Sequence, residues 1–469
     1  MDIVSASPAA GRPQKPQTSP AALFAYAIPS VPHERYRVTL NAMSGLNLYQ
    51  FYRMWRDPWR SSKDLIEMQN RRLRRLVVRL YGSHAWYRDA LDRHGVKPED
   101  IQGTQHLSRL PILTKQQLQK VNRNGILSPR PDASRLSITR TSGSSGTPLQ
   151  MVLRKKNCAR LNKNWVRPLL AYGVRPWSHR FEVSGPHNIP QHRKWYQHLG
   201  LWRITGRSIF DSPANWIDGW FAEKPDYLYG YSGSLALMAR EVLNRGIQGI
   251  HPRAVFGVSD LVGSHERNII EQAFGSPLID LYGAAEAGCI AWECHRCGAY
   301  HINADTVIVE FLRDGRPVPP GSPGKVVITN LYSDLMPIVR YDLGDVGTSS
   351  TKPSECGRGL PLMEIVEGRA DAFLTLPSGR ILSPMFWFGI MKPILGITKW
   401  RVIQQDIGRI RILIQPDSGF TPGTGEQILQ RFKAGVPEVV RIEIQRVEDI
   451  PPDPSGKVRA VISHLPSPF

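Results

Sequence analysis

Apolar residues recur every three or four positions between about residues 62 and 130, which predicts a series of amphipathic helices. Leu73, Val77 and Leu80 share one face of the stretch IEMQNRRLRRLVVRLYG, at residues 66–82. The basic run RRLRR at 71–75 lies in the same stretch. We interpret this run as the solvated face of a helix rather than as a binding patch.

The pattern changes near residue 149, where short apolar runs typical of strands begin to alternate with longer helical stretches. This alternation predicts an α/β domain with a largely parallel sheet. The strand-like runs are LQMVLR, HRFEVSG, AVFGVSD and PLIDLYG, and the helical stretches are RLNKNWVRPLLAYG, SLALMAREVLNRG and HERNIIEQAFG. From about residue 300 the pattern becomes β-rich, with DTVIVEFL, GKVVITNL and PIVRYDLGDVG.

Three regions follow from these patterns. Residues 1–35 are rich in Pro, Ser, Ala and Gln and are expected to form a disordered tail. Residues 36–368 are expected to form a large α/β domain with mostly parallel sheets and a β-rich subdomain. Residues 369–469 are expected to form a small, mobile α/β domain.

The composition narrows the class of protein. The chain has 469 residues, 41% of them hydrophobic, and a formal net charge of +20. Such a charge fits a nucleic acid, an anionic membrane or acidic small molecules as partner. No run of about 18 apolar residues predicts a membrane-spanning helix, and the N-terminus lacks the pattern of a secretory signal. Five cysteines in a chain of this size favour a reduced, cytoplasmic setting.

One short stretch has no aliphatic side chain and cannot contribute to a core. Residues 141–148 read TSGSSGTP, between the strand-like residues 136–139 and the run LQMVLR. Glycines and hydroxyl groups suit a loop that approaches an anion closely, but a flexible linker has the same composition. The stretch is not a GxxxxGK[ST] loop, because no basic residue follows Gly146.

Four further motifs follow this loop in the chain: YGAAE at 282–286, RYDLGDVG at 340–347, GRAD at 368–371 and SGKVR at 455–459. In this order, the five motifs resemble the successive signatures of the acyl-adenylate-forming enzymes. LPILTK at 110–115 and CGAYHINADTVIVEF at 297–311 are similar to the phenylacetate–coenzyme A ligase branch, with its capsular-polysaccharide (CapK-like) relatives. The resemblance covers about residues 62–465.

The resemblance implies an ATP site and a second, mobile catalytic element. Glu286 would hold Mg²⁺ on the phosphates, Asp345 would bind the ribose hydroxyls, and Lys457 would bring positive charge to the α-phosphate. Asp371 would be the hinge between the domains. The nucleotide-binding residues implied are Thr141, Ser142, Gly143, Ser144, Ser145, Gly146, Thr147, Tyr282, Gly283, Asp345 and Arg369. Taken alone, Glu286 could equally be an exposed carboxylate at a helix start, stabilised by the helix dipole.

The chain departs from the family pattern at two of these motifs. Ala372 replaces the second acidic residue of the hinge, which leaves the pivot to Asp371. Leu149 stands where many members carry a lysine after the proline of the phosphate loop. Phosphate binding is therefore expected to depend more on backbone donors.

Four residues have the spacing of a closed structural zinc site. Cys294 and Cys297 form a CxxC, His301 follows, and Cys356 lies in SECGRG. The alternative is that the cysteines are small buried hydrophobes. Ser354 occupies a position where relatives often have a further cysteine, so we take His301 as the fourth ligand, with His295 as a weaker candidate.

The acid-binding pocket is expected in loops after the strands, at GPHNIP, YLYGYSGS and GVSDL. We assign His187, Tyr229, Tyr231 and Ser259 to it, although both tyrosines could equally be packing residues. Nothing in these loops identifies the acid.

The resemblance implies an AMP-forming acid–thiol ligase that uses a carboxylic acid, ATP, Mg²⁺ and coenzyme A. A second possibility keeps the adenylation but transfers the acyl group to an amine, a sugar hydroxyl or a carrier protein. A third, from another class, is a zinc-ribbon nucleic-acid-binding protein, which the net charge and the CxxC suggest. That class leaves the five ordered motifs unexplained, so no nucleic-acid partner is expected.

Overall fold

The computed structural model describes residues 52–123, 135–140, 150–185, 188–189, 192–259, 262–333, 335–336, 338–369, 372–382, 384–391, 394–436, 438–451 and 459–466. The predicted tail at 1–35 lies outside these residues. Within them, none of the helices is long and apolar enough to cross a membrane.

The first long helix is α2 (Ser62–Ser83), which begins at Ser61, whose side chain accepts a hydrogen bond from the Asp64 backbone N–H. Leu73, Val77 and Leu80 are buried in one cluster, as their spacing predicts. In the basic run, the arginines at 71, 74 and 75 are exposed, whereas Arg72 is half-buried and donates to the Asp305 carbonyl. Most of the run is therefore a helix face in contact with solvent. Four shorter elements follow: α3 (Ala85–Arg93), η3 (Pro98–Asp100), η4 (Thr104–Arg109) and α4 (Lys115–Arg123).

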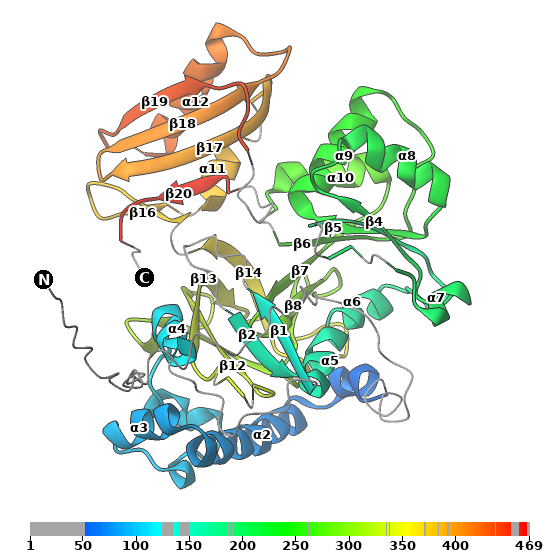
Figure 1. The fold of residues 1–469 in the computed structure, drawn as a ribbon. Helices are drawn as coiled ribbons and strands as arrows, with labels where there is room; N and C mark the ends of the chain where they lie inside the picture. Colours follow the sequence, from blue (N-terminus) through cyan, green and yellow to red (C-terminus); the bar gives the residue numbers. More distant parts are fainter. Residues whose placement is uncertain are drawn as a thin grey trace, which may run out of the picture. The chain divides into compact units, whose positions relative to one another are not determined.

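The centre of the fold is a twelve-stranded sheet with the order β11-β10-β12-β13-β14-β9-β8-β7-β6-β5-β3-β4 (Figure 1). Its parallel part contains β3 (Arg180–Ser184), β4 (Ile204–Ser208), β5 (Tyr227–Tyr231), β6 (Val255–Val258) and β7 (Leu278–Ala284). The longer helices between these strands are α8 (Pro213–Glu223), α9 (Ser232–Asn244) and α10 (Ser264–Phe274). The predicted alternation of strands and helices is therefore confirmed.

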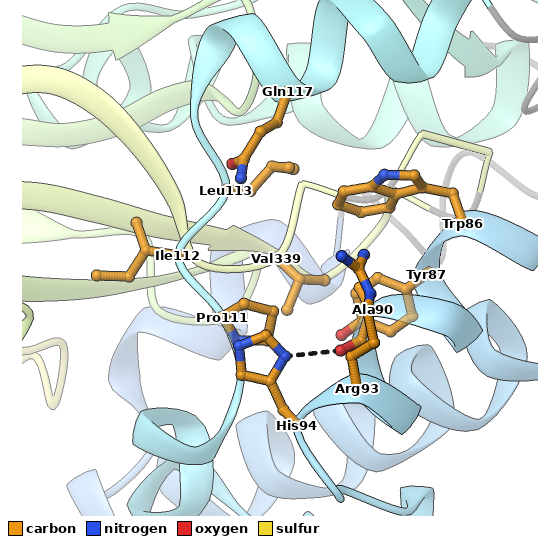
Figure 2. A pocket seen from close by; sticks show the side chains of 10 residues that line it. All are labelled: Trp86, Tyr87, Ala90, Arg93, His94, Pro111, Ile112, Leu113, Gln117 and Val339. Carbon is orange, nitrogen blue, oxygen red and sulfur yellow. Dashed lines mark hydrogen bonds between the residues drawn. The ribbon is translucent and has the colours of Figure 1, made fainter.

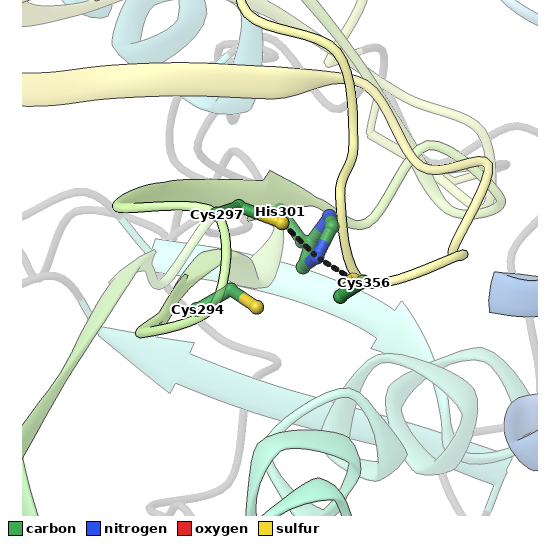
Figure 3. Close-up of side chains that lie close together, drawn as sticks. All are labelled: Cys294, Cys297, His301 and Cys356. Carbon is green, nitrogen blue, oxygen red and sulfur yellow. Dashed lines mark hydrogen bonds between the residues drawn. The ribbon is translucent and has the colours of Figure 1, made fainter.

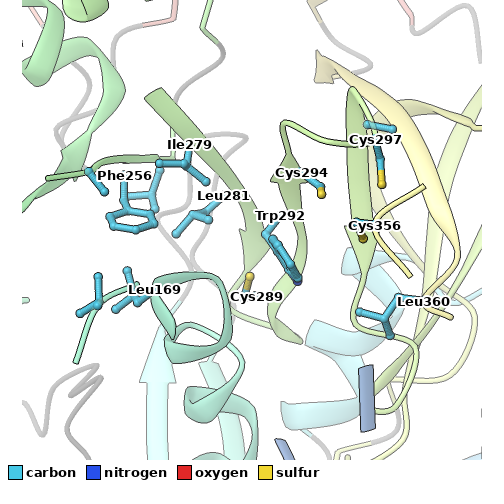
Figure 4. Packing of buried hydrophobic residues seen from close by; sticks show 14 of the residues in the cluster. Leu169, Phe256, Ile279, Leu281, Cys289, Trp292, Cys294, Cys297, Cys356 and Leu360 are labelled. Carbon is cyan, nitrogen blue, oxygen red and sulfur yellow. The ribbon is translucent and has the colours of Figure 1, made fainter. Parts of the chain in front are cut away.

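β3, β5 and β6 are buried on both faces, so the side chains that alternate between the two sides of each strand are all buried. In β5, Leu228 packs in the cluster that α8, α9 and α10 cover. Tyr227, Tyr229 and Tyr231 belong to the cluster on the other side. Figure 4 shows other members of this cluster, among them Phe256, Leu281 and Trp292. The tyrosine segment was expected to be a cleft loop, and the structure corrects this, since these residues form a central strand.

The β-rich part continues the same sheet rather than forming a separate one. It contains β8 (Gly288–Cys294), β9 (Ala299–Ile302), β10 (Val307–Arg313), β11 (Arg316–Pro317), β12 (Pro323–Asn330), β13 (Tyr341–Ser349) and β14 (Leu362–Arg369). The direction changes at the β7–β8 hairpin, where Gly288 has φ of +71°, a backbone conformation that favours glycine.

Smaller sheets and the remaining helices complete the described residues. β1 (Leu136–Arg140) pairs with β2 (Gln150–Arg154). Two helices, α5 (Lys155–Lys163) and α6 (Val166–Ala171), lie between β2 and β3, and a short one, α7 (Trp195–His198), lies between β3 and β4. The C-terminal part has a hairpin, β15 (Leu374–Thr375) and β16 (Ile381–Leu382), and a four-stranded sheet with the order β19-β18-β17-β20. These strands are β17 (Ile397–Asp406), β18 (Arg409–Pro416), β19 (Arg441–Arg446) and β20 (Val461–Ser463), with α11 (Pro384–Met391) and α12 (Pro422–Gly435). The domain boundary at residue 369 stays a prediction.

Candidate active site and metal centre

Three of the predicted nucleotide-site residues meet at Asp345. The Tyr282 hydroxyl, on β7, donates a 2.7 Å hydrogen bond to Oδ2 of this carboxylate. The Arg369 guanidinium, at the end of β14, lies 3.1 Å from Oδ1 and also donates to the Leu343 carbonyl. Both carboxylate oxygens are therefore held, and the side chain has one orientation. Burial, followed by the Asp345 charge, raises the pKa of Tyr282 well above its usual value, so the hydroxyl stays a donor.

Gly344 leaves room for this arrangement. Its φ is +73°, and a Cβ added there would lie 3.0 Å from the Arg369 Nη2. A side chain would therefore strain the backbone and press on the guanidinium. The glycine beside Asp345 in the RYDLGDVG motif thus has a steric reason.

Glu286 lies in the turn between β7 and β8 and is 8% exposed. Its carboxylate accepts a long hydrogen bond of 3.4 Å from the Tyr341 hydroxyl, and its backbone carbonyl accepts one of 2.7 Å from Asn330. Burial raises the pKa of Glu286, and the Asp345 charge raises it further, whereas Arg369 lowers it. The exposed helix-start carboxylate considered above is therefore excluded. A buried carboxylate beside a second carboxylate, that of Asp345, suits a hard cation such as Mg²⁺.

Lys115, to which the sequence motifs assign no role, lies beside this group. The backbone of Leu113 pairs with Tyr341 in a parallel β-bridge, through hydrogen bonds of 2.8 Å to the Arg340 carbonyl and 3.0 Å from the Asp342 N–H. Lys115 follows two residues later as the first residue of α4. Its ammonium interacts electrostatically with Arg369 and Glu286, and burial, followed by Arg369, lowers its pKa. The signal for this residue was the LPILTK segment, which was noted only for its resemblance.

A cavity of about 90 Å³ lies on the other side of Leu113 (Figure 2). Trp86 and Tyr87 of α3 form one wall, and Pro111, Ile112 and Val339 form another. Burial raises the pKa of Tyr87 above its usual range. The cavity is thus largely apolar and separate from the carboxylates of the predicted nucleotide site.

The four predicted zinc ligands come together in one buried cluster (Figure 3). The Cys294, Cys297 and Cys356 sulfurs and an imidazole nitrogen of His301 all lie within 4.8 Å of one another. His301 Nε2 is 3.1 Å from the Cys356 sulfur and 3.8 Å from that of Cys297. A tetrahedral zinc with bonds of 2.0–2.3 Å separates its ligand atoms by roughly 3.5 Å. The donor set therefore fits this metal.

The surroundings of His301 and Cys356 favour the protonation states that bind a metal, whereas those of Cys294 do not. Burial, followed by the Arg358 charge, lowers the pKa of His301 to about 4 and keeps the imidazole neutral. Burial disfavours the Cys356 thiolate, but hydrogen bonds from Arg358 and Ser354 lower its pKa to about 7. Burial raises the pKa of Cys294 to about 11, which a bound cation would reverse. His295 is exposed and its ring contacts the Leu278 carbonyl, so it is not a ligand in this arrangement.

The predicted acid pocket is only partly described. Tyr229 and Tyr231 are buried core residues, the first under the Arg180 guanidinium at 4.9 Å and the second 3.5 Å from the Asn188 amide. Ser259 is exposed, at the end of β6, with φ of +75°. His187 lies outside the described residues. The assignment of these residues to the acid stays a prediction.

Several predicted catalytic and phosphate-binding residues also lie outside the described residues. These are Thr141, Ser142, Gly143, Ser144, Ser145, Gly146, Thr147, Asp371 and Lys457. Gly283 is described, and a Cβ there would lie 2.5 Å from the Trp165 ring. Close packing against Trp165 therefore accounts for a glycine at position 283, and its predicted role at the nucleotide stays a prediction.

Comparison with known proteins supports the motif-based resemblance. Residues 374–464 match the CapK C-terminal domain family. A phenylacetate-coenzyme A ligase of Thermus thermophilus is 26% identical over 327 residues, which cover 66% of this chain and 71% of that protein. A phenylacetate-coenzyme A ligase of Escherichia coli is 24% identical over 340 residues, 67% of this chain and 74% of that protein.

Solved structures show the same fold. A 2-hydroxyisobutyryl-CoA ligase in complex with 2-HIB-AMP superposes with a TM-score of 0.72 at 17% identity, over 87% of this chain and 91% of that one. ATP-bound MatB from Rhodopseudomonas palustris superposes with a TM-score of 0.52 at 16% identity. The superposition covers 72% of this chain and 70% of that one. The resemblance to the acyl-adenylate-forming enzymes and their phenylacetate–coenzyme A ligase branch is confirmed, as is the α/β fold class.

Proposed function

We propose that this protein is an AMP-forming carboxylic acid–coenzyme A ligase. In the first step a carboxylate attacks the α-phosphate of ATP, which gives an acyl-adenylate and pyrophosphate. In the second step the thiol of coenzyme A attacks the acyl carbon and AMP leaves. The observation that carries the proposal is the Asp345 carboxylate, fixed between Tyr282 and Arg369 and close to the buried Glu286. The named relatives support the same chemistry.

Each residue of this group has a distinct task in the proposed reaction. Asp345 presents a fixed pair of acceptor oxygens, which suits the two hydroxyls of a ribose. Glu286 provides a carboxylate oxygen for Mg²⁺, which would neutralise the phosphate charge. The cationic side chains of Lys115 and Arg369 suit the negative charge that develops on the phosphates.

Lys457 and Asp371 complete the proposed mechanism on the basis of their motifs. The Lys457 ammonium would stabilise the charge that builds up at the α-phosphate during adenylation. The thiol must then reach the same acyl group, so the small domain would turn about Asp371 between the two steps. The loop 141–148 would bind the leaving phosphates through backbone and hydroxyl donors.

The cysteine–histidine cluster has a separate role in this proposal. Cys294, Cys297, His301 and Cys356 would hold one zinc ion, with all four tetrahedral positions filled by protein. Such a closed site has no position for a substrate. The metal would therefore join the β8–β9 hairpin to the segment at residue 356 and stabilise the β-rich part of the sheet.

Acid-dependent exchange of labelled pyrophosphate into ATP tests the first step, with a panel of aromatic, aryl-acetic and short branched acids. Exchange with at least one acid is expected, and its absence with all acids would contradict the adenylation. Coenzyme A, amines, sugars and a carrier protein are then supplied in turn as acceptors. Thioester formation with coenzyme A is expected, whereas turnover only with another acceptor would correct the second step. Binding to a nucleic acid with no exchange would revive the zinc-ribbon interpretation.

A further inference from the structure

Three large apolar side chains are exposed at one end of the parallel strands. Trp177 is 66% exposed, Trp195 is 64% exposed and Leu199 is 69% exposed. Trp177 precedes β3, and the other two residues lie on and directly after α7, which leads into β4 (Figure 1). Large apolar side chains that are exposed together often mark a surface that binds a partner or a membrane.

The backbone joins these two segments. The Trp202 N–H donates to the Pro176 carbonyl, and the Arg180 N–H donates to the Arg203 carbonyl over 2.9 Å. β3 and β4 are parallel and begin in register, with Arg180 opposite Ile204. The residues just before the two strands therefore lie at the same edge of the sheet. We call Trp177, Trp195 and Leu199, together with the exposed Arg175, Arg193 and Arg203, the α7 surface.

The α7 surface is strongly basic. Residues 171–210 contain six lysines and arginines, at 175, 180, 193, 194, 203 and 207, and one acidic residue, Glu182. Glu182 is buried and paired with Arg180 at 2.8 Å, so it does not offset the surface charge. Arg175, Arg193 and Arg203 are exposed, as are His192 and His198.

Two acidic residues approach this surface from the neighbouring elements, and each faces an arginine. Glu223, at the end of α8, lies 4.0 Å from Arg193. Asp226, before β5, lies 3.6 Å from Arg253. Neither carboxylate is an unpaired charge among the arginines. The local charge is therefore positive, in line with the net charge of +20 for the whole chain.

The α7 surface is separate from the candidate active site. It lies at the amino ends of β3 and β4, whereas Tyr282 lies near the carboxyl end of β7, which belongs to the same parallel set. Ligands of open α/β sheets bind at the carboxyl ends of the strands. A partner at the α7 surface would thus leave the candidate active site accessible.

We propose that the α7 surface docks on an anionic lipid bilayer. The two indoles and Leu199 would enter the interface between headgroups and acyl chains, and the exposed arginines would face the lipid phosphates. Tryptophan prefers this interface because its ring is both apolar and polar, and basic residues gain from the negative surface potential. Aromatic rings alone would also suit nucleic-acid bases, but the exposed aliphatic side chain of Leu199 beside Trp195 favours lipid.

Vesicle binding of the full chain tests the proposal. Sucrose-loaded vesicles of one part phosphatidylglycerol to two parts phosphatidylcholine should sediment the protein, and vesicles of phosphatidylcholine alone should bind it much more weakly. The variant Trp195→Ser/Leu199→Ser should bind the anionic vesicles at least about tenfold more weakly than the wild type does. Arg175→Ser/Arg203→Ser should lose a similar factor of about tenfold, and the loss should shrink at high salt.

Matched variants separate this surface from general charge and stickiness. Leu395 and Val439 are more exposed than Trp177, Trp195 and Leu199, at 82% and 95%. Leu395→Ser/Val439→Ser is the apolar control, and Arg316→Ser/Lys352→Ser is the charge control, since both of its residues are exposed. The two controls should bind like the wild type, and all variants should keep the wild-type thermal unfolding.

Insertion itself has a spectroscopic test. Phosphatidylglycerol brominated on its acyl chains should quench part of the tryptophan fluorescence, and Trp177→Phe/Trp195→Phe should remove that quenching while the protein still binds. Equal weakening by the control variants would overturn the proposal, as would binding without quenching. Tight, salt-sensitive binding to an RNA or DNA oligonucleotide, lost in the α7-surface variants but with no vesicle binding, would assign the surface to nucleic acid instead.

Discussion

The Tyr282 hydroxyl and the Asp345 carboxylate are joined by a 2.7 Å hydrogen bond, although 63 positions separate them in the chain. The bond crosses from β7, in the parallel part of the sheet, to β13, in the antiparallel part. It links two motifs that the sequence shows only as neighbours in order. The predicted nucleotide site thus depends on both parts of the sheet being one structure.

Tyr282→Phe should raise the KM for ATP by about tenfold, the scale of one hydrogen bond to a charged group. The substitution frees one oxygen of Asp345, which then loses its single orientation. Pyrophosphate exchange at varied ATP measures the effect. Tyr172→Phe is the control, because the hydroxyl of this half-buried tyrosine donates to the Glu293 carbonyl over 3.1 Å, outside the predicted nucleotide site. An unchanged KM in Tyr282→Phe would contradict the role of this bond.

Glu286→Gln should slow pyrophosphate exchange by roughly 10²-fold, because it removes a metal-binding charge at nearly constant volume. Burial raises the pKa of this carboxyl, so the neutral amide should leave the free energy of unfolding unchanged or higher. Exchange measured over a range of Mg²⁺ concentrations should show the largest defect at limiting Mg²⁺. A defect that does not depend on Mg²⁺ would refute the assignment.

Lys115→Met should slow exchange by about tenfold or more, since one cationic contact at a phosphoryl centre is lost. Lys115→Arg should retain part of the rate, because the charge remains. Lys352→Met, at an exposed position, is the control for the loss of a lysine. If Lys115→Met exchanges at the wild-type rate, the ammonium has no part in adenylation and only opens α4.

The purified protein should contain one zinc ion per chain by elemental analysis. Cys297→Ser should lose the metal and about 2.7 kcal/mol of unfolding free energy, the stabilisation expected from a ligand held at one hundred times its Kd. Cys289→Ser is the control, because Cys289 is a buried free thiol outside the cluster. Metal-free wild type with unchanged stability would refute the zinc site.

Asp280 should make the stability depend on pH. Burial, with a contribution from the Glu293 charge, raises the pKa of this carboxyl to about 7. The folded state therefore holds a proton that the unfolded state releases at lower pH, and stability falls as the pH rises from about 4 to about 7. Asp280→Asn, which cannot ionise, should gain stability over the wild type by about 1 kcal/mol or more near pH 8.

Urea unfolding of both proteins at a series of pH values measures this difference. The gain of Asp280→Asn should be small near pH 4, should grow until about pH 7 and should stay constant above it. The carboxyl accepts a 2.8 Å hydrogen bond from the Tyr300 hydroxyl, which the amide oxygen of asparagine can still accept. A gain that is the same at all pH values would mean that Asp280 keeps an ordinary pKa.

The sequence alone predicted the local elements well. The spacing of Leu73, Val77 and Leu80 identified the buried face of α2, because a helix brings residues three and four apart to one side. The apolar runs at β6 and β7 predicted buried strands. The sequence also identified all four members of the cysteine–histidine cluster, because the CxxC motif holds two possible ligands within one turn.

The sequence led to a wrong prediction for β5, where buried and exposed residues do not alternate along the strand. Tyr227–Tyr231 resembles a loop, because Gly230 and the serines that follow are common in turns. The segment is nevertheless a strand buried on both faces, where polar and apolar residues do not alternate. Local sequence could not distinguish the two cases, because the faces of β5 are covered by residues from distant parts of the chain.

Only the tertiary structure brought the distant groups together. Lys115 lies near Glu286 because Leu113 pairs with Tyr341, and Cys356 lies 3.1 Å from His301 across 55 positions of the chain. A motif determines which chemical groups a chain carries and in which order. The distances between those groups depend on strand pairing across the whole sheet, which local propensity and spacing do not determine.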